Sequence, residues 1–428
     1  MHFPAEFKSL LILVFIAYLM KEGFEYLLRY LNFRYMKKFG LTVPPILEGK
    51  VNAELLKKIL DYETDKTRFS FISSLFGTLV TIVFIFGGIL NLYNSWVTSL
   101  HMPFIVSGLL FFLILSYVNT LLAVPFTLYH TFRIENAYGF NTMTPKLWLK
   151  DFIKSIMLST IITGILVSAG LWIVQSNADS WWIWVWGFFL VFSLFMMYIS
   201  PYVIEPLFNK FTPIEDQELV GQIRSILQKI GITVSRVFRM DASRRSRHTN
   251  AYFSGIGRVK RIILYDTLLE TMNQDEMLAV LAHEAGHWKK KHILKMIIAT
   301  EVLSFFVLYA VFLTFRTDVL TDLFLIQHET FYAKIVVLGF LGGIISFPFT
   351  PLRSFISRRF EKEADRFAFF LTGNNDSMIS ALIKLSKDNL SNLHPHPLYA
   401  AFYYSHPPMI QRIGQIRKLK RDVGKQIE

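Results

Sequence analysis

The sequence contains no cysteine among its 428 residues. This absence excludes disulfide bonds and thiolate metal sites, so a bound metal ion would need histidine, aspartate or glutamate ligands. Charged residues are also scarce, at 18% of the chain, whereas 53% of the residues are hydrophobic. A single soluble core cannot bury so much apolar surface. The composition therefore predicts a protein whose solvent is largely a lipid bilayer.

Acidic residues are outnumbered, because 32 Asp and Glu stand against 45 Lys and Arg and leave a net charge of +13. Such an excess can indicate nucleic-acid binding. Here, however, no basic stripe stands outside the loops between apolar segments, and membrane proteins accumulate Lys and Arg in their cytoplasmic loops. We therefore expect no nucleic-acid partner.

Seven apolar stretches come near the length of about 20 residues that crosses a bilayer as a helix. They predict an all-α, multi-spanning membrane protein. We expect membrane helices one to five in residues 1–200, a cytosolic segment in 201–292, helices six and seven in 293–350, and a cytosolic C-terminal part in 351–428. The expected spans are 9–31, 69–92, 104–129, 152–174, 181–198, 293–315 and 331–347.

Every second loop between these spans nearly lacks Lys and Arg. Residues 93–103 and 175–180 contain neither, and residues 316–329 contain only Arg316, whereas the other loops and the C-terminal tail are basic. Because positively charged loops stay on the cytoplasmic side, this alternation predicts an N-terminus that is lumenal or outside the cell. The C-terminus is then cytosolic.

A short β-hairpin is expected in the cytosolic segment. Residues 250–253 and 261–265 are β-prone and flank the sequence SGIG at 254–257. Two such runs separated by small turn residues are typical of a hairpin.

The segment LAHEAGHWKKKH, residues 281–292, contains an HExxH motif. Histidines four residues apart share one helical face, so His283 and His287 can bind the same ion. Glu284 beside them can then act as general base on a water molecule. The motif predicts a zinc hydrolase with one zinc ion per chain; the alternative is a pair of histidines at a membrane interface.

Local signals place this motif on one long helix. Asn273 followed by Glu276 resembles a capping box, so the helix is expected to begin there and to run unbroken into the sixth span. On such a helix Glu301, 18 residues beyond His283, would point the same way. Because a carboxylate against lipid is costly, this face should look into a water-containing interior. The first span also contains a charged stripe that should face this water-containing interior. Its residues are Glu22, Glu25 and Arg29.

A catalytic zinc site needs a third protein ligand. The stretch SRRFEKEADRFA offers Glu361 and Asp365 one turn apart, on a helix expected to end at Gly373. We assign Glu361 to the metal and Asp365 to a position behind it that orients a ligand histidine. Further on, His406 precedes two prolines and could donate to a developing oxyanion; the alternative is an ordinary turn histidine. Two nearby residues are expected to take no part, His292 and Glu363.

Together these motifs resemble those of the type I CaaX prenyl proteases, which are integral membrane zinc metalloproteases. The similarity extends over nearly the whole chain. The resemblance implies a barrel of seven helices around a water-filled chamber, with a small zincin-like domain near its cytosolic end. Its most specific parts are DKTRFSF at 65–71, FRIENAYGFN at 132–141, NKF at 209–211, RSRHTNAYFSGIGRVKRIILYDTLL at 245–269 and YYSHPP at 403–408.

The resemblance also implies roles for individual residues. His283, His287 and Glu361 match the metal ligands of the family. Glu284 matches its general base, and His406 matches the histidine that assists at the scissile carbonyl.

Substrate contacts are implied for Asn250 and Ala251, in an edge strand that would pair with the substrate backbone, and for Arg412. The implied substrate is a prenylated CaaX protein, met in the endoplasmic reticulum membrane of a eukaryote or the inner membrane of a bacterium. Two alternatives stay open at this point. One is a quality-control membrane metalloprotease, and the other is a seven-span transporter or receptor with a structural metal.

Overall fold

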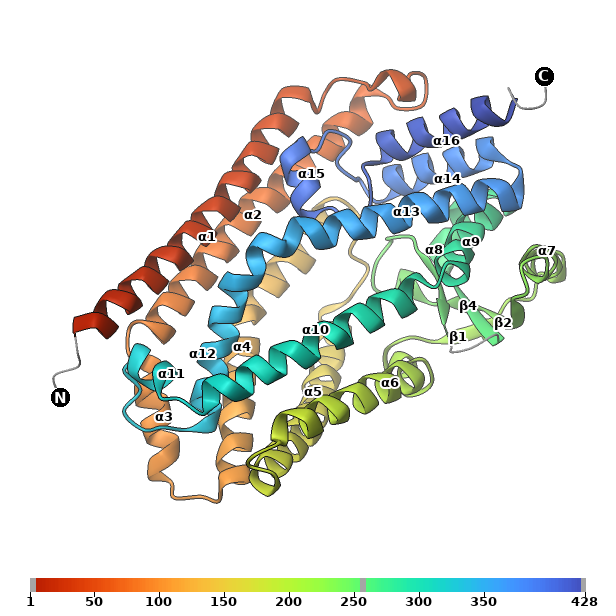
Figure 1. Ribbon diagram of the computed structural model, residues 1–428. Helices are drawn as coiled ribbons and strands as arrows, with labels where there is room; N and C mark the ends of the chain where they lie inside the picture. The colour runs from red at the N-terminus through yellow and green to blue at the C-terminus, as the bar shows by residue number, and fades with distance from the viewer. Residues whose placement is uncertain (1–4, 255–258, 425–428) are drawn as a thin grey trace.

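The computed structural model describes residues 5–254 and 259–424 of the protein. Long helices dominate it. Figure 1 shows that a small sheet and the C-terminal helices gather toward one end of these long helices, whereas the short helices α3 (Ile89–Ser99) and α11 (Val319–Leu323) lie at the other end. The sheet and the C-terminal helices therefore form a separate part of the molecule at one end of the long apolar helices.

Six helices of the described residues are long and apolar enough to cross a membrane. Large apolar side chains are exposed along them, as at Ile72, Leu121 and Val191, which suits a surface facing lipid. The six are α2 (Ala53–Ile85), α4 (Phe104–Tyr129) continued by the π-helical turn His130–Glu135, α5 (Pro145–Ser176), α6 (Trp181–Phe208), α10 (His292–Phe315), and α12 (Phe331–Ser346) continued through Phe347–Phe349 into α13 (Thr350–Thr372).

The predicted first span lies within α1 (Ala5–Phe39), which is 35 residues long but is not among these six. The expected charged stripe interrupts its apolar run. Glu25 pairs with Lys21 at 2.9 Å and with Arg29 at 3.6 Å, and Glu22 accepts a hydrogen bond from Thr78 of α2 at 2.9 Å. The charges of α1 are thus neutralised against each other and against the neighbouring helix.

The predicted hairpin is part of a larger, mixed sheet with the strand order β1-β2-β4-β3. Strands β3 (Ala251–Ser254) and β4 (Val259–Tyr265) pair antiparallel as expected, and residues 255–257 of the expected turn lie outside the described residues. The sequence analysis missed that β4 also pairs in parallel with β2 (Thr233–Met240), which in turn pairs with β1 (Phe211–Pro213). Strand β3 is therefore an edge.

One hydrophobic core joins this sheet to the motif helix. Leu227 of α7 (Gln217–Gln228), Ile262 of β4 and Leu281 of α9 (Gln274–Lys289) are fully buried in the same cluster. The apolar residues of α7 recur at helical spacing and supply one face of this core. The packing fixes α9 against the sheet and so sets the height of the HExxH motif above the edge strand.

The capping box is confirmed: the Asn273 side chain accepts from the Glu276 backbone N–H, and the Glu276 carboxylate accepts from the Asn273 backbone N–H. The prediction of an unbroken helix is wrong. Helix α9 ends at Lys289, Lys291 adopts a left-handed conformation with φ of 56°, and α10 begins at His292. Because a left-handed residue cannot continue a right-handed helix, the chain changes direction here.

The C-terminal part packs directly on the motif helix. Helix α13 crosses α9 so closely at Gly286 that a Cβ atom there would lie 3.0 Å from the Cα of Ala364. As predicted, α13 ends at Gly373, whose φ is 65°. The remaining elements are η1 (Pro45–Leu47), η3 (Ala242–Arg244), α8 (Asp266–Thr271), α14 (Asn375–Asp388), α15 (Pro397–Tyr403) and α16 (Met409–Gly424).

Candidate active site

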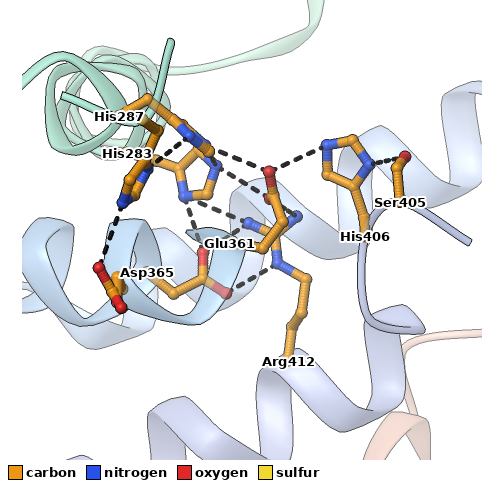
Figure 2. A network of polar contacts seen from close by, with 9 residues as sticks. His283, His287, Glu361, Asp365, Ser405, His406 and Arg412 are labelled. Atoms are coloured by element: carbon orange, nitrogen blue, oxygen red, sulfur yellow. Dashed lines mark hydrogen bonds and ion pairs between the residues drawn. The ribbon is translucent and has the colours of Figure 1, made fainter. Parts of the chain in front are cut away.

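The HExxH helix and α13 bring three side chains to one point, as Figure 2 shows. His283 and His287 lie 3.2 Å apart between their Nε2 atoms. Glu361 Oε2 lies 3.3 Å from His283 Nε2, and Glu361 Oε1 lies 3.2 Å from His287 Nε2. Of the residues described, this trio is the group whose ligand atoms are close enough to hold a metal ion.

The spacing of these atoms fits a tetrahedral ion. Ligand atoms that bind zinc at about 2.0–2.1 Å lie about 3.3 Å apart along the edges of the tetrahedron. The separation of the two histidine nitrogens matches this value, and each nitrogen has a different oxygen of Glu361 at a similar distance. In addition, Glu361 Oε2 is buried and has no hydrogen-bond partner among the described residues, although a buried carboxylate oxygen normally has one. The donor set of two imidazoles and a carboxylate is therefore a suitable zinc site.

Asp365 and Arg412 lie behind the ligands. His283 Nδ1 lies 2.8 Å from Asp365 Oδ1 and donates to it when Nε2 serves the metal. Arg412 of α16 holds the same carboxylate with two hydrogen bonds of 2.8 and 2.5 Å. Burial alone would lower the pKa of His283, but its hydrogen bonds to Asp365 and Glu361 raise this pKa to about 9. The ring is therefore held firmly by anionic neighbours.

His292 has a position that the sequence analysis did not anticipate. It is 2% exposed, and its Nδ1 atom lies 3.1 Å from His287 Nδ1. Its Nε2 atom lies 3.2 Å from Glu363 Oε2, and its ring stacks on Phe360 at 4.2 Å. On a continuous helix His292 would lie about 140° from His287. The break at Lys291 returns it to the metal side, so spacing alone could not reveal this contact.

His406 approaches the ligands from the loop before α16, as Figure 2 shows. Its Nε2 atom lies 3.3 Å from Glu361 Oε1, and its Nδ1 atom lies 2.8 Å from Ser405 Oγ. The side chain is 61% exposed, whereas that of Glu361 is 5% exposed. His406 thus stands at the open side of the site.

A cavity of about 170 Å³ joins the remaining predicted residues to this centre. Glu284 lies in it, and burial, the largest influence, raises the pKa of its carboxyl group above the ordinary value. Ala251 reaches the cavity from the edge strand β3. The predicted site residues that line it are Asn250, Ala251, His283, Glu284, His406 and Arg412.

Two larger cavities adjoin the site. One, of about 760 Å³, extends from His406 and Arg412 toward Arg29 of α1 and Lys66 of α2. The other, of about 500 Å³, contains His287 and Glu361 and reaches Glu301. Glu301, which was expected to point the same way as His283 into a polar interior, thus lines one cavity with His287, although the continuous helix behind that prediction is absent.

Comparisons with known proteins agree over most of the chain. Residues 32–210 match the family described as "CAAX prenyl protease N-terminal, five membrane helices", and residues 213–420 match "Peptidase family M48". A CAAX prenyl protease 1 homolog of Arabidopsis thaliana is 35% identical, with 90% of this chain and 93% of the relative covered. CAAX prenyl protease 1 of Saccharomyces cerevisiae is 34% identical, with 90% of each chain covered.

A solved structure is similar as well. The crystal structure of Ste24p from S. mikatae matches with a TM-score of 0.87 and 31% sequence identity, and the match covers 95% of this chain and 99% of that one. Sequence similarity at this level over nearly full length, together with a shared fold, means that this chain belongs to the CAAX prenyl protease 1 family of M48 metallopeptidases.

Proposed function

We propose that this protein is a membrane-embedded zinc endopeptidase that hydrolyses peptide bonds near the C-terminus of prenylated CaaX proteins. One observation carries the proposal. The ligand atoms of His283, His287 and Glu361 lie within 4.8 Å of one another beside the buried Glu284, in a cavity that opens onto an edge strand. The names of the related proteins supply the substrate class.

One zinc ion per chain is the proposed cofactor, held by His283, His287 and Glu361. The chemistry that zinc supplies when bound is Lewis acidity, which makes water nucleophilic near neutral pH and polarises a carbonyl. Asp365 orients His283 through Nδ1, at 2.8 Å. Because it is itself held by Arg412, a shift of this carboxylate would need two further hydrogen bonds to break.

Glu284 is the proposed general base. It accepts a proton from the attacking water and later delivers it to the leaving amine. A raised pKa suits both halves of this task, because a carboxylate with an ordinary pKa is a weak acid catalyst at neutral pH. His406 is the proposed donor to the scissile carbonyl oxygen as negative charge develops there, a role worth about 3 kcal/mol per donor.

An extended peptide is proposed to align along β3. This strand has a partner on only one side, so Asn250 and Ala251 can offer backbone groups to a substrate strand. Arg412 faces the same cavity while it holds Asp365. Its guanidinium therefore contributes positive potential to the substrate path as well as to the zinc site.

The membrane arrangement is proposed as follows. Helix α1 adds a seventh span to the six apolar helices, and the seven enclose a water-filled chamber to which the 760 Å³ cavity belongs. The N-terminus is lumenal or outside, and the C-terminus and the zinc site face the cytosol. The membrane is that of the endoplasmic reticulum in a eukaryote, or the inner membrane in a bacterium. A tag at the C-terminus that is accessible from outside would refute this orientation.

The decisive experiment compares three reactions of the purified, zinc-loaded protein: cleavage of a farnesylated CaaX peptide, of the same peptide without its prenyl group, and of the farnesylated peptide after chelator treatment. We expect cleavage in the first reaction only. Equal rates on the two peptides would favour a quality-control protease instead. The Glu284→Gln variant should retain zinc and lose turnover by about 10²–10⁴-fold; unchanged turnover would remove Glu284 from the mechanism.

A further inference from the structure

A cavity of about 520 Å³ lies between the beginning of α5, the end of α6 and strands β1 and β2. None of its lining residues belongs to the zinc site. Six cationic side chains line it and Asp151 is the single acidic one among its lining residues, which leaves an excess of five positive charges. The cationic residues are Lys150, Lys154, Lys210, Arg244, Arg245 and Arg261.

Three of these cations are held in place from behind. Arg245 donates to Asp151 at 2.8 Å and to Asn209 at 3.3 Å. Lys154 donates to the backbone carbonyl of Leu207 at 2.5 Å. Arg261 donates to the carbonyl of Pro201 at 3.0 Å and lies over the rings of Tyr202 and Phe238, 5.0 and 4.7 Å from their centroids.

The positive charge is poorly compensated by the protein. Among the described residues, Lys150, Lys210 and Arg261 have no acidic side chain within ion-pair distance, and Arg244 reaches Asp241 only at 4.0 Å. Like charges gathered in one concave site repel each other, and the repulsion grows where the surroundings are less polar than water. An anion with several acceptor oxygens would relieve it, and the planar fork of arginine suits phosphate.

The cavity also borders a surface suited to lipid. Ile153 of α5 and Val203 and Leu207 of α6 are exposed beside it. Aromatic pairs lie at the same level, with Trp148 stacked on Phe152 and Tyr198 beside Tyr202. Aromatic residues concentrate where the hydrocarbon of a bilayer meets water. A molecule with a phosphate group and acyl chains could therefore meet the cations and the apolar helix surfaces together.

We propose that this cavity, defined by Lys150, Lys154, Lys210, Arg244, Arg245 and Arg261, binds a phosphate group carried by the headgroup of an anionic phospholipid. The headgroup enters between α5 and β1, and the acyl chains lie against α5 and α6. Basic pockets between membrane helices are known to suit such headgroups. The inference depends on the membrane location of the chain and is independent of the proposed proteolytic reaction.

The test measures ligand binding to the purified, full-length protein in a neutral detergent, with three probes: a short-chain phosphatidic acid, the matching phosphatidylcholine, and inorganic phosphate. We expect saturable binding of phosphatidic acid at one molecule per chain, and much weaker binding of the other two. Equal binding of both lipids would overturn the proposal. Inorganic phosphate that binds as tightly as phosphatidic acid would overturn the lipid assignment.

The variant Lys150→Gln/Lys210→Gln removes two exposed cations whose side chains have no acidic partner among the described residues. Each of the two substitutions alone should weaken the binding of phosphatidic acid by roughly fivefold, and the two together should weaken it by about 25-fold. A matched control, Lys57→Gln/Lys58→Gln, removes the same charge from the exposed surface of α2 and should bind as the unaltered protein does. Equal losses in the two variants would mean that net charge alone attracts the lipid, and would refute a site.

Protein folding is monitored separately. Both double variants should bind one zinc ion and elute from a sizing column as the unaltered protein does. If the cavity variant loses zinc as well, the single variant Lys210→Gln, whose side chain is fully outside the sheet pairing, provides the deciding measurement. Unchanged affinity of that variant for phosphatidic acid would count against the proposal.

Discussion

Replacing His292 by phenylalanine should weaken zinc binding about 10 to 100-fold while leaving the fold intact. With His287 Nε2 at the metal, its Nδ1–H donates to His292 Nδ1, and His292 Nε2–H donates to Glu363. This chain of hydrogen bonds holds the ligand ring in one orientation. Phenylalanine retains the stacking on Phe360, which lies 4.2 Å away, and removes the hydrogen bonds.

The magnitude follows from the burial of the contact. His292 is 2% exposed, so phenylalanine at this position would leave the Nδ1–H of His287 without its protein acceptor. Leaving a buried donor unsatisfied costs about 1–3 kcal/mol. Because every 1.4 kcal/mol corresponds to about a tenfold change in an equilibrium constant, this cost would weaken zinc binding by about 10 to 100-fold. Losses of this size are usually found for residues behind a metal ligand.

The assay is competition for zinc between the purified protein and a chelator of known affinity, at fixed pH and salt. Glu363→Gln should show a smaller loss, because His292 would keep a neutral partner. His101→Phe replaces an exposed histidine far from the motif in the sequence and serves as the control. Unchanged zinc affinity in His292→Phe, with a stoichiometry of one, would show that His287 is oriented without His292.

Three further predictions concern residues of α9. Glu284 must be ionised to accept a proton, and burial raises its pKa above the ordinary 4.5; kcat/KM should therefore fall as the pH drops through that raised value, and an acid limb below pH 4.5 would contradict the role. Gly286→Ala would place a Cβ 3.0 Å from Ala364, so it should push α13 away, cost about 1–3 kcal/mol of stability and reduce zinc occupancy measured by metal analysis, whereas an unchanged metal content would contradict this. In Glu276→Gln, Lys384 and Ser380 lose their buried carboxylate partner at 2.7 and 2.6 Å. The free energy of unfolding, measured by thermal unfolding, should fall by about 1–3 kcal/mol. Burial raises the pKa of Glu276, but hydrogen bonds from Lys384 and Ser380 outweigh it and lower this pKa below its ordinary value. The stabilisation by Glu276 is therefore present above the ordinary pKa and is lost as the pH falls through the folded-state pKa. If the Glu276→Gln variant lost the same amount of stability over that pH range, the assignment would be refuted.

The candidate site illustrates how two helices distant in sequence can supply ligands to one metal ion. His283 and His287 come from α9, and Glu361 comes from α13, more than seventy residues later. Their ligand atoms meet because Gly286 lets the two helix backbones approach closely. A larger residue at this crossing would separate Glu361 from the histidines before it affected either helix alone. The glycine inside HExxH segment AHEAGH is thus explained by packing between helices.

Local features of the fold could be predicted with good accuracy. The capping box at Asn273 and Glu276, the end of α13 at Gly373 and the pairing of β3 with β4 each depend on neighbours within a few residues, so composition and spacing were enough. The parallel pairing of β2 with β4 was missed because parallel strands are joined by long connections and leave no turn signal. The seventh span, in α1, stays a prediction: charged residues interrupt its apolar run, and their pairing with each other exists only in three dimensions.

The sequence by itself determined the chemistry of this protein: residue types and helical spacing name the metal-binding histidines and the adjacent base, since side chains four residues apart must share a helical face. The tertiary structure alone decided that His292 stands behind His287 and that Arg412 holds Asp365. The reversal at Lys291 brings His292 to His287, and the crossing of α9 and α13 brings Glu361 and Asp365 to His283. These contacts depend on chain directions set by packing between distant segments, and no periodicity along the sequence encodes such directions.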